Sequence, residues 1–552
     1  KSIRILARRA YDDVNNKLRY EFFPQKTAAN GDGSRLREFK RLVLRSSGND
    51  NGFAFIRDEL FQTLAGHAGY KDYQAVRPAV MFINGDYHGV YWLHEVQKNE
   101  EYFKEHYGSY KGYFETLEGG ETFKDLDEDE SNQKAIDDYN RMYDKYSKLD
   151  LTDDKNFQEL SELMDVDNYL RYYALQIYIG NEDWPHNNYK TYRYYKAEDE
   201  KYGQEPFDGK WRYFLHDLDY SFGIYGTGPY VDNIQKYIGK NGEIKGEAPM
   251  FGQLMQREDC KQTFITMTLD LINGAFAPSF INTVLDEMHA SRIKEQERMY
   301  GKNLVADWVQ FHQLEGRLDE IRNYGIGRSW HILKKYKEYF GMDNTYELTV
   351  EPSKGSEITI NTFRTKEDFK GNYYSNYETL VKTTVPAGQE FDYWLVNGSK
   401  ISNLELVIDS SMIKDEKVQL KCVFKEKAED PKLIISELSS AGDKDYIILH
   451  NPYSVEVSLA GYSITDDLLK EKKFRLPGIT LKSGESIKLL CEKNPDSLEK
   501  GQYRTDFNLK AGESLVLFRQ DEIVDEVLIP NLINPYRRDL STMRFYEIDG
   551  PT

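Results

Sequence analysis

The chain has 552 residues, 39% of them hydrophobic and 30% charged, with a formal net charge of −19 at pH 7. A chain of this length exceeds what a single hydrophobic core supports, so several domains are expected. The acidic balance excludes a nucleic-acid partner, because no basic field is available to attract phosphate backbones.

Cys260, Cys422 and Cys491 lie far apart in the sequence, and no CxxC pair occurs. This pattern argues against a zinc site and against a disulfide framework. No run of about eighteen apolar residues is present, so no membrane span is expected. The opening "KSIRILARRAYDD" lacks the charged start and apolar stretch of a signal peptide, which we expect to lie outside the 552 residues.

Residues 1–110 predict a small lobe with an antiparallel sheet and one helix. "SIRILARR" and "KLRYEFF" alternate with period two and are expected to pair as a hairpin, and "EFKRLVLRSS" is a further strand. "FIRDELFQTLAGHAG" has helical spacing and ends on Gly. "AVRPAVMFING" and "GVYWLHEV" follow as two strands around an Asn-Gly turn, a strong hairpin signal.

Residues 111–342 are expected to form a mainly helical lobe. "DVDNYLRYYALQIYIGN" begins with a capping Asp and carries apolar residues on one face. "YKTYRYYKA" and "KWRYFLHDLDYSFG" are two strands, and amphipathic helices continue from residue 250 to 342.

After residue 345 the pattern is that of strands. Residues 345–427 predict a small β module, "AEDPK" at 428–432 a linker, and 433–548 a β sandwich with strand signals at short, regular intervals. The expected fold class is therefore an α+β two-lobed domain followed by two all-β modules.

Two polar stretches could carry chemistry. "GNEDWPHNNYK" places Asp183 five residues before Asn188, and "HDLDYSFG" contains Asp217 and Asp219. Phosphoryl transfer needs a carboxylate near the attacking hydroxyl and oxygen ligands for Mg²⁺, and protein kinases supply them with this order and spacing. Taken alone, each stretch is also ordinary turn composition.

Residues 1–342 resemble the CotH kinase family of atypical protein kinases. The stretches that carry the resemblance are "KSIRILARRAYDD", "LVLRSSGNDNGFAFIRDELFQTLAG", "MFINGDYHGVYWLHEV", "GNEDWPHNNYKTYR" and "WRYFLHDLDYSFG". The resemblance implies a two-lobed kinase-like fold that uses ATP with Mg²⁺ or Mn²⁺. It also implies Ser/Thr phosphorylation of a surface or spore-coat protein.

Carried over residue by residue, the resemblance makes Asp183 the catalytic Asp. Asn188, Asp217 and Asp219 become metal ligands, with Asn187 an alternative to Asn188 and Asp219 a second ligand or a support for the turn. His186 is expected to be structural or at the substrate edge, and His216 to be packed under the turn.

The small lobe supplies the cofactor-binding candidates. Asp50 and the pair Arg57-Asp58 match the family, and the helix that carries this pair could supply an ion-pair partner to a phosphate-binding cation, although helix-surface charges are more often solvated. Glu95 follows the last strand, where it could position the adenine edge or an Arg; a solvated strand end is an equal alternative. No GxGxxG occurs, and Lys40, Arg41 and Arg45 compete for the role of the phosphate-binding Lys. Arg45 is the candidate, since it shares a face with Arg41 by period two.

The β modules show resemblances of their own. "GQEFDYWLVNG" resembles internalin-type surface repeats, with Trp394 as the buried ring, and residues 433–548 resemble a lamin-tail domain. Both imply a secreted or cell-surface location and envelope or glycan contacts.

The predicted function is a secreted or surface protein kinase. One alternative is a nucleotidyl- or sugar-phosphotransferase on the same fold. Others are an adhesion or scaffold protein with a degenerate kinase domain, and a carbohydrate-binding protein suggested by the 42 tyrosines.

Overall fold

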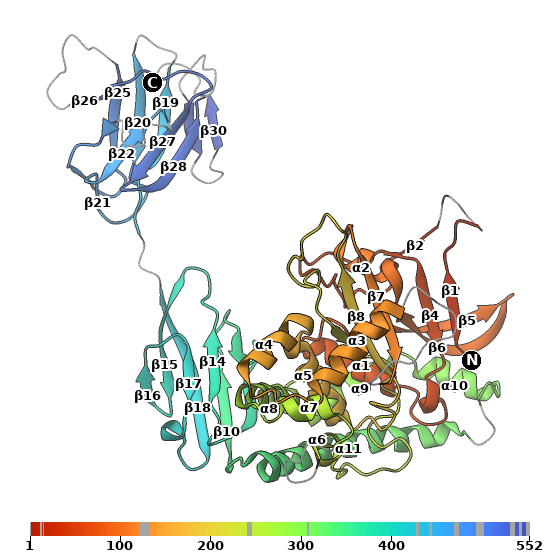
Figure 1. Ribbon diagram of the computed structural model, residues 1–552. Helices are drawn as coiled ribbons and strands as arrows, with labels where there is room; N and C mark the ends of the chain where they lie inside the picture. The colour runs from red at the N-terminus through yellow and green to blue at the C-terminus, as the bar shows by residue number, and fades with distance from the viewer. Residues whose placement is uncertain are drawn as a thin grey trace. The chain divides into compact units, whose positions relative to one another are not determined.

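The computed structural model describes residues 2–10, 14, 16–120, 133–239, 246–305, 309–426, 430–440, 444–467, 474–492, 502–529, 536–539 and 544–547. The chain divides into two compact units, Lys1–Lys425 and Glu426–Thr552, each with its own hydrophobic core. The first unit mixes helices and sheets and the second is built of strands (Figure 1).

An antiparallel sheet in the order β1-β4-β6-β5 begins the first unit. The predicted β5–β6 hairpin forms, and its turn residues Asn84 and Gly85 have φ of 52° and 89°, as a type I′ turn requires. The bounds are β1 (Ile3–Leu6), β2 (Leu18–Arg19), β3 (Glu38–Phe39), β4 (Arg41–Arg45), β5 (Val76–Ile83) and β6 (Asp86–Glu95).

The expected hairpin between "SIRILARR" and "KLRYEFF" is wrong. β1 pairs with β4, while the short β2 pairs with β3. Period two identifies a strand but not its partner, because long-range packing selects the neighbour.

Helix α1 (Arg57–His67) follows β4 through the 3₁₀ turn η1 (Gly48–Gly52). The carboxylate of Asp50 accepts the backbone N–H groups of Ala54, Ile56 and Arg57 at 3.1, 2.7 and 2.9 Å. It thus satisfies donors that a helix N-terminus otherwise leaves unpaired. The apolar side of α1, including Leu60, is buried in the same core as Trp92 of β6.

The rest of the first unit is rich in helices, as predicted. Asp165 caps α5 by accepting the N–H of Asn168, and α5 ends at Gly180 with φ of 61°. The helices are α2 (Asn99–Tyr107), α3 (Gln133–Tyr146), α4 (Asp154–Leu163), α5 (Val166–Ile179), α6 (Asn233–Ile238), α7 (Pro249–Leu254), α8 (Glu258–Asn273), α9 (Pro278–Ala290), α10 (Ile293–Gly301) and α11 (Leu314–Phe340).

A second antiparallel sheet contains β7 (Tyr113–Gly119), β8 (Tyr189–Tyr195) and β9 (Arg212–Phe214) in that order. The helical reading of residues 111–342 did not contain β7. Tyrosines fill much of the core around this sheet, and their rings pack edge to face or stacked, as for Tyr172 on Trp184 and Tyr173 on Phe251. These tyrosines therefore stabilise the interior.

The small β module packs on the helices and belongs to the first unit. Asn273 of α8 exchanges two hydrogen bonds with the backbone of Asn372, and Trp394 is fully buried as expected. The strands are β10 (Thr345–Glu351), β11 (Ile358–Ile360), β12 (Phe363–Thr365), β13 (Phe369–Tyr374), β14 (Thr379–Thr383), β15 (Gln389–Val396), β16 (Ser399–Ile401), β17 (Leu406–Ile408) and β18 (Lys417–Glu426).

The second unit is all β in the described residues. Its larger sheets have the orders β26-β25-β20-β19-β29-β30 and β23-β22-β27-β28. The strands are β19 (Ile434–Ser439), β20 (Asp445–His450), β21 (Val457–Ser458), β22 (Tyr462–Thr465), β23 (Phe474–Arg475), β24 (Thr480–Leu481), β25 (Ser486–Cys491), β26 (Tyr503–Thr505), β27 (Ser514–Arg519), β28 (Glu522–Leu528), β29 (Tyr536–Asp539) and β30 (Arg544–Glu547).

All three cysteines are buried and free. Within the described residues no single helix is long and apolar enough to span a membrane. The pair α8 and α9, bent by 57°, passes the same test when the two helices are taken together.

Candidate active site

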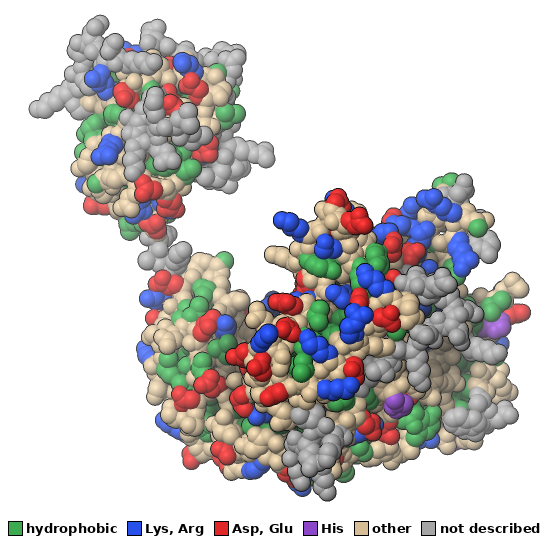
Figure 2. Space-filling view, viewed as in Figure 1, with side chains coloured by type: hydrophobic (Ala, Val, Ile, Leu, Met, Phe, Trp, Pro, Cys, Tyr) green, Lys and Arg blue, Asp and Glu red, His purple; other side chains and the backbone are tan. Residues whose placement is uncertain are grey.

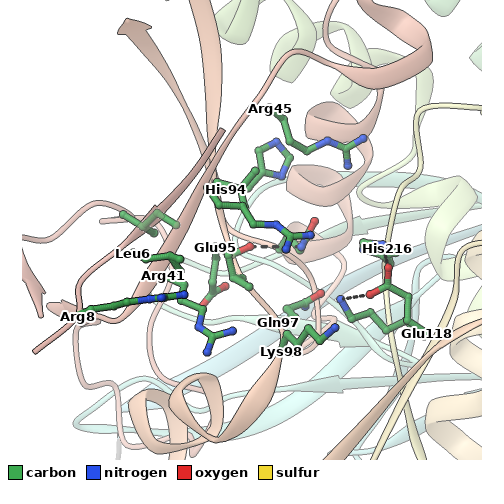
Figure 3. Close-up of a pocket in the computed structure, with 16 residues that line it drawn as sticks. Leu6, Arg8, Arg41, Arg45, His94, Glu95, Gln97, Lys98, Glu118 and His216 are labelled. Carbon is green, nitrogen blue, oxygen red and sulfur yellow. Dashed lines mark hydrogen bonds and ion pairs between the residues drawn. The ribbon is translucent and has the colours of Figure 1, made fainter. Parts of the chain in front are cut away.

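A cavity of about 310 Å³ lies between the first sheet and the β7–β8–β9 sheet. Arg4 and Leu6 of β1, Arg41 to Val43 and Arg45 of β4, and the chain from His94 to Lys98 line one side. Glu118 of β7, Lys190 of β8 and His216 line the other (Figure 3). Acidic and basic side chains are interspersed over the visible face of the molecule (Figure 2), whereas cations are frequent in this cavity.

The face of β4 toward the cavity carries Arg41, Val43 and Arg45, as period two predicted. Lys40 points elsewhere, because its Nζ donates to the backbone carbonyl of Asn16 at 2.6 Å. The structure therefore removes Lys40 from the three competing cations.

Arg45 connects the strand to α1 and to the Asp217 turn. Its guanidinium donates to Asp58 Oδ2 at 2.7 Å and to Asp217 Oδ1 at 2.5 Å, and it lies 3.6 Å from Asp219 Oδ2. Burial disfavours the charge of Arg45, but Asp58 and Asp217 outweigh that effect and raise its pKa above the usual range.

Asp58 of α1 belongs to the pair Arg57-Asp58, which the family resemblance offered as an ion-pair partner for the phosphate-binding cation, and it is the partner of Arg45. It is fully buried and also accepts the backbone N–H of Leu218 at 3.0 Å, so it holds the Asp217-Leu218-Asp219 turn against the helix. Burial works against its ionised form, but Arg45 prevails and lowers the pKa of Asp58.

Asp58, Glu59 and His94 place possible ligand atoms within 4.8 Å of one another. His94 and Glu59 hydrogen-bond at 3.0 Å, and burial raises the pKa of Glu59. Because Arg45 already neutralises Asp58, this group is a buried charge network behind the cavity rather than a metal centre.

Asp219 is held by the loop that precedes α1. The Asn49 N–H donates to Asp219 Oδ2 at 2.7 Å and the Asn49 Nδ2 to Oδ1 at 3.1 Å. Burial, followed by the charge of Asp217, raises the pKa of Asp219 to about 7. Asp219 therefore supports the turn, and its other predicted role, that of a second metal ligand, stays a prediction.

Asp183 lies at the centre of its own loop. Asn187 Nδ2 donates to Asp183 Oδ1 at 3.0 Å, and Asn188 Nδ2 donates to Oδ2 at 2.9 Å. His186 Nε2 lies 3.5 Å from Asp183 Oδ1 and its side chain is exposed, so His186 has an acidic neighbour within its own loop. Asn188 has φ of 55°, a left-handed conformation that Asn tolerates.

The two loops run side by side. The Glu182 N–H donates to the Tyr220 carbonyl at 3.1 Å, and the Phe222 N–H donates to the Ile179 carbonyl at 3.0 Å. Phe222 also packs against Phe61 of α1, with ring centroids 4.7 Å apart. The backbone therefore brings the Asp183–Asn188 loop next to the Asp217 turn.

The donor chemistry of these loops fits a divalent metal. Carboxylate oxygens of Asp217 and Asp219 and the amide oxygen of Asn188 are hard oxygen ligands of the kind Mg²⁺ and Mn²⁺ bind. With its Nδ2 donating to Asp183, the Asn188 side chain keeps its amide oxygen for a metal.

Lys190, Glu118 and His216 form a polar cluster on the opposite wall. Lys190 Nζ lies 3.2 Å from Glu118 Oε2, and His216 Nε2 lies 3.4 Å from Glu118 Oε1. The His216 hydrogen bond is the main cause that lowers the pKa of Glu118. His216 thus lines the cavity and is not packed beneath the turn as expected.

The structure corrects the expected cofactor-binding roles of Asp50, Arg57 and Glu95. Asp50 and Arg57 are fully buried, bind each other and do not line the cavity, because Asp50 is used to begin α1. Glu95 does line the cavity, but its carboxylate binds Lys26 at 2.8 Å and His106 at 2.5 Å. Glu95 is thus neither a solvated strand end nor the partner of an Arg.

Fold and site together define a helix-plus-sheet protein with clustered carboxylates beside a cationic cavity. A family model described as CotH kinase protein matches residues 12–332, more than half of the chain. The chain belongs to the CotH kinase family, and a kinase-like phosphotransferase function follows from that membership.

Other comparisons add little. No curated protein matches the chain. One similar solved structure is a DUF4876 family protein from Bacteroides thetaiotaomicron, with 11% identity, 32% of this chain covered, 66% of that chain covered and a TM-score of 0.12. The match thus spans just under two thirds of that protein, and a score this low carries no argument about fold.

Proposed function

We propose that this chain is an ATP-dependent, Mg²⁺- or Mn²⁺-dependent protein kinase that phosphorylates Ser/Thr hydroxyls. The observation that carries the proposal is the Arg45 bridge between Asp58 of α1 and Asp217, at 2.7 and 2.5 Å. In protein kinases a strand cation pairs with a carboxylate of the neighbouring helix, and the Asp of the next turn binds metal. We propose that the ion pair of Arg45 with Asp58 corresponds to this strand–helix pair and that Asp217 is the metal-binding Asp.

In the proposed reaction the acceptor hydroxyl oxygen forms a bond to the γ-phosphorus while the bond to the β–γ bridging oxygen breaks. Asp183 orients the hydroxyl and accepts its proton, and ADP leaves with the electron pair of the broken bond. Asn188 and Asp217 would hold the metal, which would supply positive charge to neutralise phosphate oxygens. Asn187 and Asn188 keep the Asp183 carboxylate in place.

The placement of the enzyme and its β modules belongs to the same proposal. We propose that the protein is secreted or attached to the cell surface, where its acceptor is a surface or coat protein. Residues 345–427 would be an internalin-type repeat and residues 433–548 a lamin-tail-like sandwich with envelope or glycan contacts. The buried Trp394 supports the first of these resemblances.

The test uses the whole chain with ATP labelled in the γ or the α position, with Mn²⁺ or Mg²⁺ and a generic protein acceptor. We expect transfer of the γ label alone, and loss of transfer by at least about 100-fold in Asp183→Ala and Asp217→Ala. Asp199→Ala, which removes an exposed partner of Lys111, is the matched control and should keep activity.

Other outcomes have defined meanings. Transfer of the α label would identify a nucleotidyltransferase. Equal labelling by the wild type and both active-site variants would overturn the assignment of Asp183 and Asp217. Absence of nucleotide binding in the wild type would favour the scaffold alternative.

A further inference from the structure

Lys190 is a buried lysine whose side chain reaches the cavity. The side chain is 4% exposed, yet it lines the cavity floor on β8. Glu118 lies directly opposite on β7 in the strand register, and the two groups form an ion pair at 3.2 Å. Burial lowers the pKa of Lys190, and Glu118 acts against this effect by stabilising the charged ammonium group. An anion in the cavity would stabilise that charge further.

Glu118, the ion-pair partner of Lys190, also contacts a second group. The Glu118 side chain is 45% exposed and is shared with His216 at 3.4 Å. In the described residues Lys190 has no other ion pair within 4 Å. An anionic ligand entering the cavity can therefore approach Lys190 from the open side while Glu118 turns to His216.

Arg45 is in the opposite situation. Its guanidinium faces Asp58, Asp217 and Asp219 within 3.6 Å, so three carboxylates already offset one positive charge. A phosphate group beside Arg45 would meet carboxylates of its own sign. The positive charge of Arg45, which the sequence predicts to bind phosphate, is therefore already neutralised by carboxylates of the protein itself.

The remaining cations of the cavity are less suited. Arg4, Arg8 and Lys98 have exposed side chains, so water and salt screen their charges. Arg41 is 37% exposed and already lies 3.8 Å from the carboxylate of Glu101. Lys190 acts from a buried position, where the effective dielectric constant is lower and an ionic contact is stronger.

We propose that Lys190 binds the phosphate groups of the nucleotide, and that Glu118 holds it in place when the cavity has no anion. This rests on the proposed function in that the ligand is taken to be a nucleoside di- or triphosphate. Lysine suits the role as a compact point charge with three donors. The phosphate cation would come from β8, two residues after Asn188, and not from β4.

The experiment is calorimetric titration of the full chain with adenosine, AMP, ADP, ATP and inorganic tripolyphosphate. Lys190→Met should weaken the binding of ADP and ATP by about 10- to 100-fold, which corresponds to the loss of a hydrogen bond to a charged group. It should change the affinity for adenosine by less than about twofold. Lys190→Arg should restore part of the loss. Lys111→Met removes an exposed lysine and should bind every ligand as the wild type does.

Glu118→Gln is expected to change nucleotide affinity in the opposite direction. With the competing carboxylate removed, ADP and ATP should bind about threefold more tightly, whereas a structural role for the ion pair predicts weaker binding. Thermal unfolding of each variant, measured in parallel, identifies any loss of fold.

Three results would overturn the proposal. They are an unchanged ATP affinity in a folded Lys190→Met, an equal loss for adenosine and ATP, or weaker ATP binding by Glu118→Gln. A wild type that binds tripolyphosphate through Lys190 but no adenine nucleotide would refute the proposed function and keep the phosphate site. Binding of neither ligand would refute both.

Discussion

Gly48 is a single residue on which the geometry of the candidate site depends. Its φ is 49°, and a Cβ built on it would lie 2.0 Å from Asp219 Oδ2 and 3.0 Å from Arg45 Nη2. The Asp219 side chain cannot move away from an added Cβ, because it is 1% exposed and hydrogen-bonded to Asn49. Glycine is therefore required both for the backbone conformation and for the close approach of the carboxylate.

Gly48→Ala should destabilise the first unit by about 3 kcal/mol and reduce phosphotransfer, because strain and the displaced Asp219 add together. The measurement is urea unfolding together with the labelled-ATP assay. Gly69→Ala is the matched control: φ is 80° and nothing lies within 4 Å of its Cβ position, so only about 1 kcal/mol of backbone cost is expected. Equal effects of the two substitutions would contradict the crowding argument.

Arg328 acts at the scale of whole elements. It is fully buried on α11 and donates to the carbonyls of Ile177 and Tyr178 at the end of α5, at 2.6 and 2.9 Å. It also donates to the carbonyls of Pro229 and Val231 at 3.0 and 2.7 Å. One side chain thus joins three segments, including the helix that leads into the Asp183 loop.

Arg328→Met should cost about 3 kcal/mol, since it leaves buried carbonyls without donors. It should also lower kcat while KM changes less, because the C-terminal end of α5 positions the Asp183 loop. Urea unfolding and steady-state kinetics check both. Arg322→Met, on the same helix but in ion pairs with the exposed Asp286 and Asp319, should cost less than about 1 kcal/mol. Similar losses in both variants would argue against the special role of Arg328.

Individual elements were well predicted from local patterns. The cap of α5 at Asp165, the turn at Asn84-Gly85 and the face of β4 with Arg45 all follow from short-range rules. The pairing of β1 with β4 and the presence of the strand β7 could not be predicted from local patterns, because strand pairing depends on residues far away in sequence.

At the scale of the molecule, a buried carboxyl joins the β module to the helices. Asp270 of α8 accepts hydrogen bonds from the backbone N–H and the hydroxyl of Thr362, the former at 2.7 Å. Burial raises the pKa of Asp270 from 3.8 to about 7, against the effect of the Thr362 bonds. The stability from its neutral form is complete below pH 3.8 and is lost as the pH rises through about 7.

Between pH 6 and pH 8 the unfolding free energy of the first unit should therefore fall through Asp270 by about 1 kcal/mol. Asp270→Asn stays neutral and should lack this component. The measurement is urea unfolding of both proteins at pH 6, 7 and 8. A constant difference between the two proteins across this range would contradict the assigned pKa.

The division of the core predicts where the chain can be cut. Residues 345–422 share one hydrophobic core with the helices, whereas the core from Leu433 onward is separate. A fragment of residues 1–425 should keep the unfolding temperature and nucleotide affinity of the first unit. A fragment of residues 1–342 should aggregate or unfold at a lower temperature, because it exposes buried apolar surface. Comparable stability of the two fragments in thermal unfolding would show that the β module is dispensable.

The sequence by itself determined most of the helices and strands and the lack of a disulfide framework, and it predicted Asp183, Asn188 and Asp217 as positions of the candidate site. The helices and strands follow from periodicity and turn chemistry, which act over a few residues, whereas the site positions are implied by the resemblance to the CotH kinase family. Only the tertiary structure decided that Arg45 is surrounded by Asp58, Asp217 and Asp219, that Asp50 and Arg57 pair with each other, and that Lys190 lines the cavity. The physical reason is that burial and Coulomb interactions depend on distance in space, which spacing along the chain does not encode.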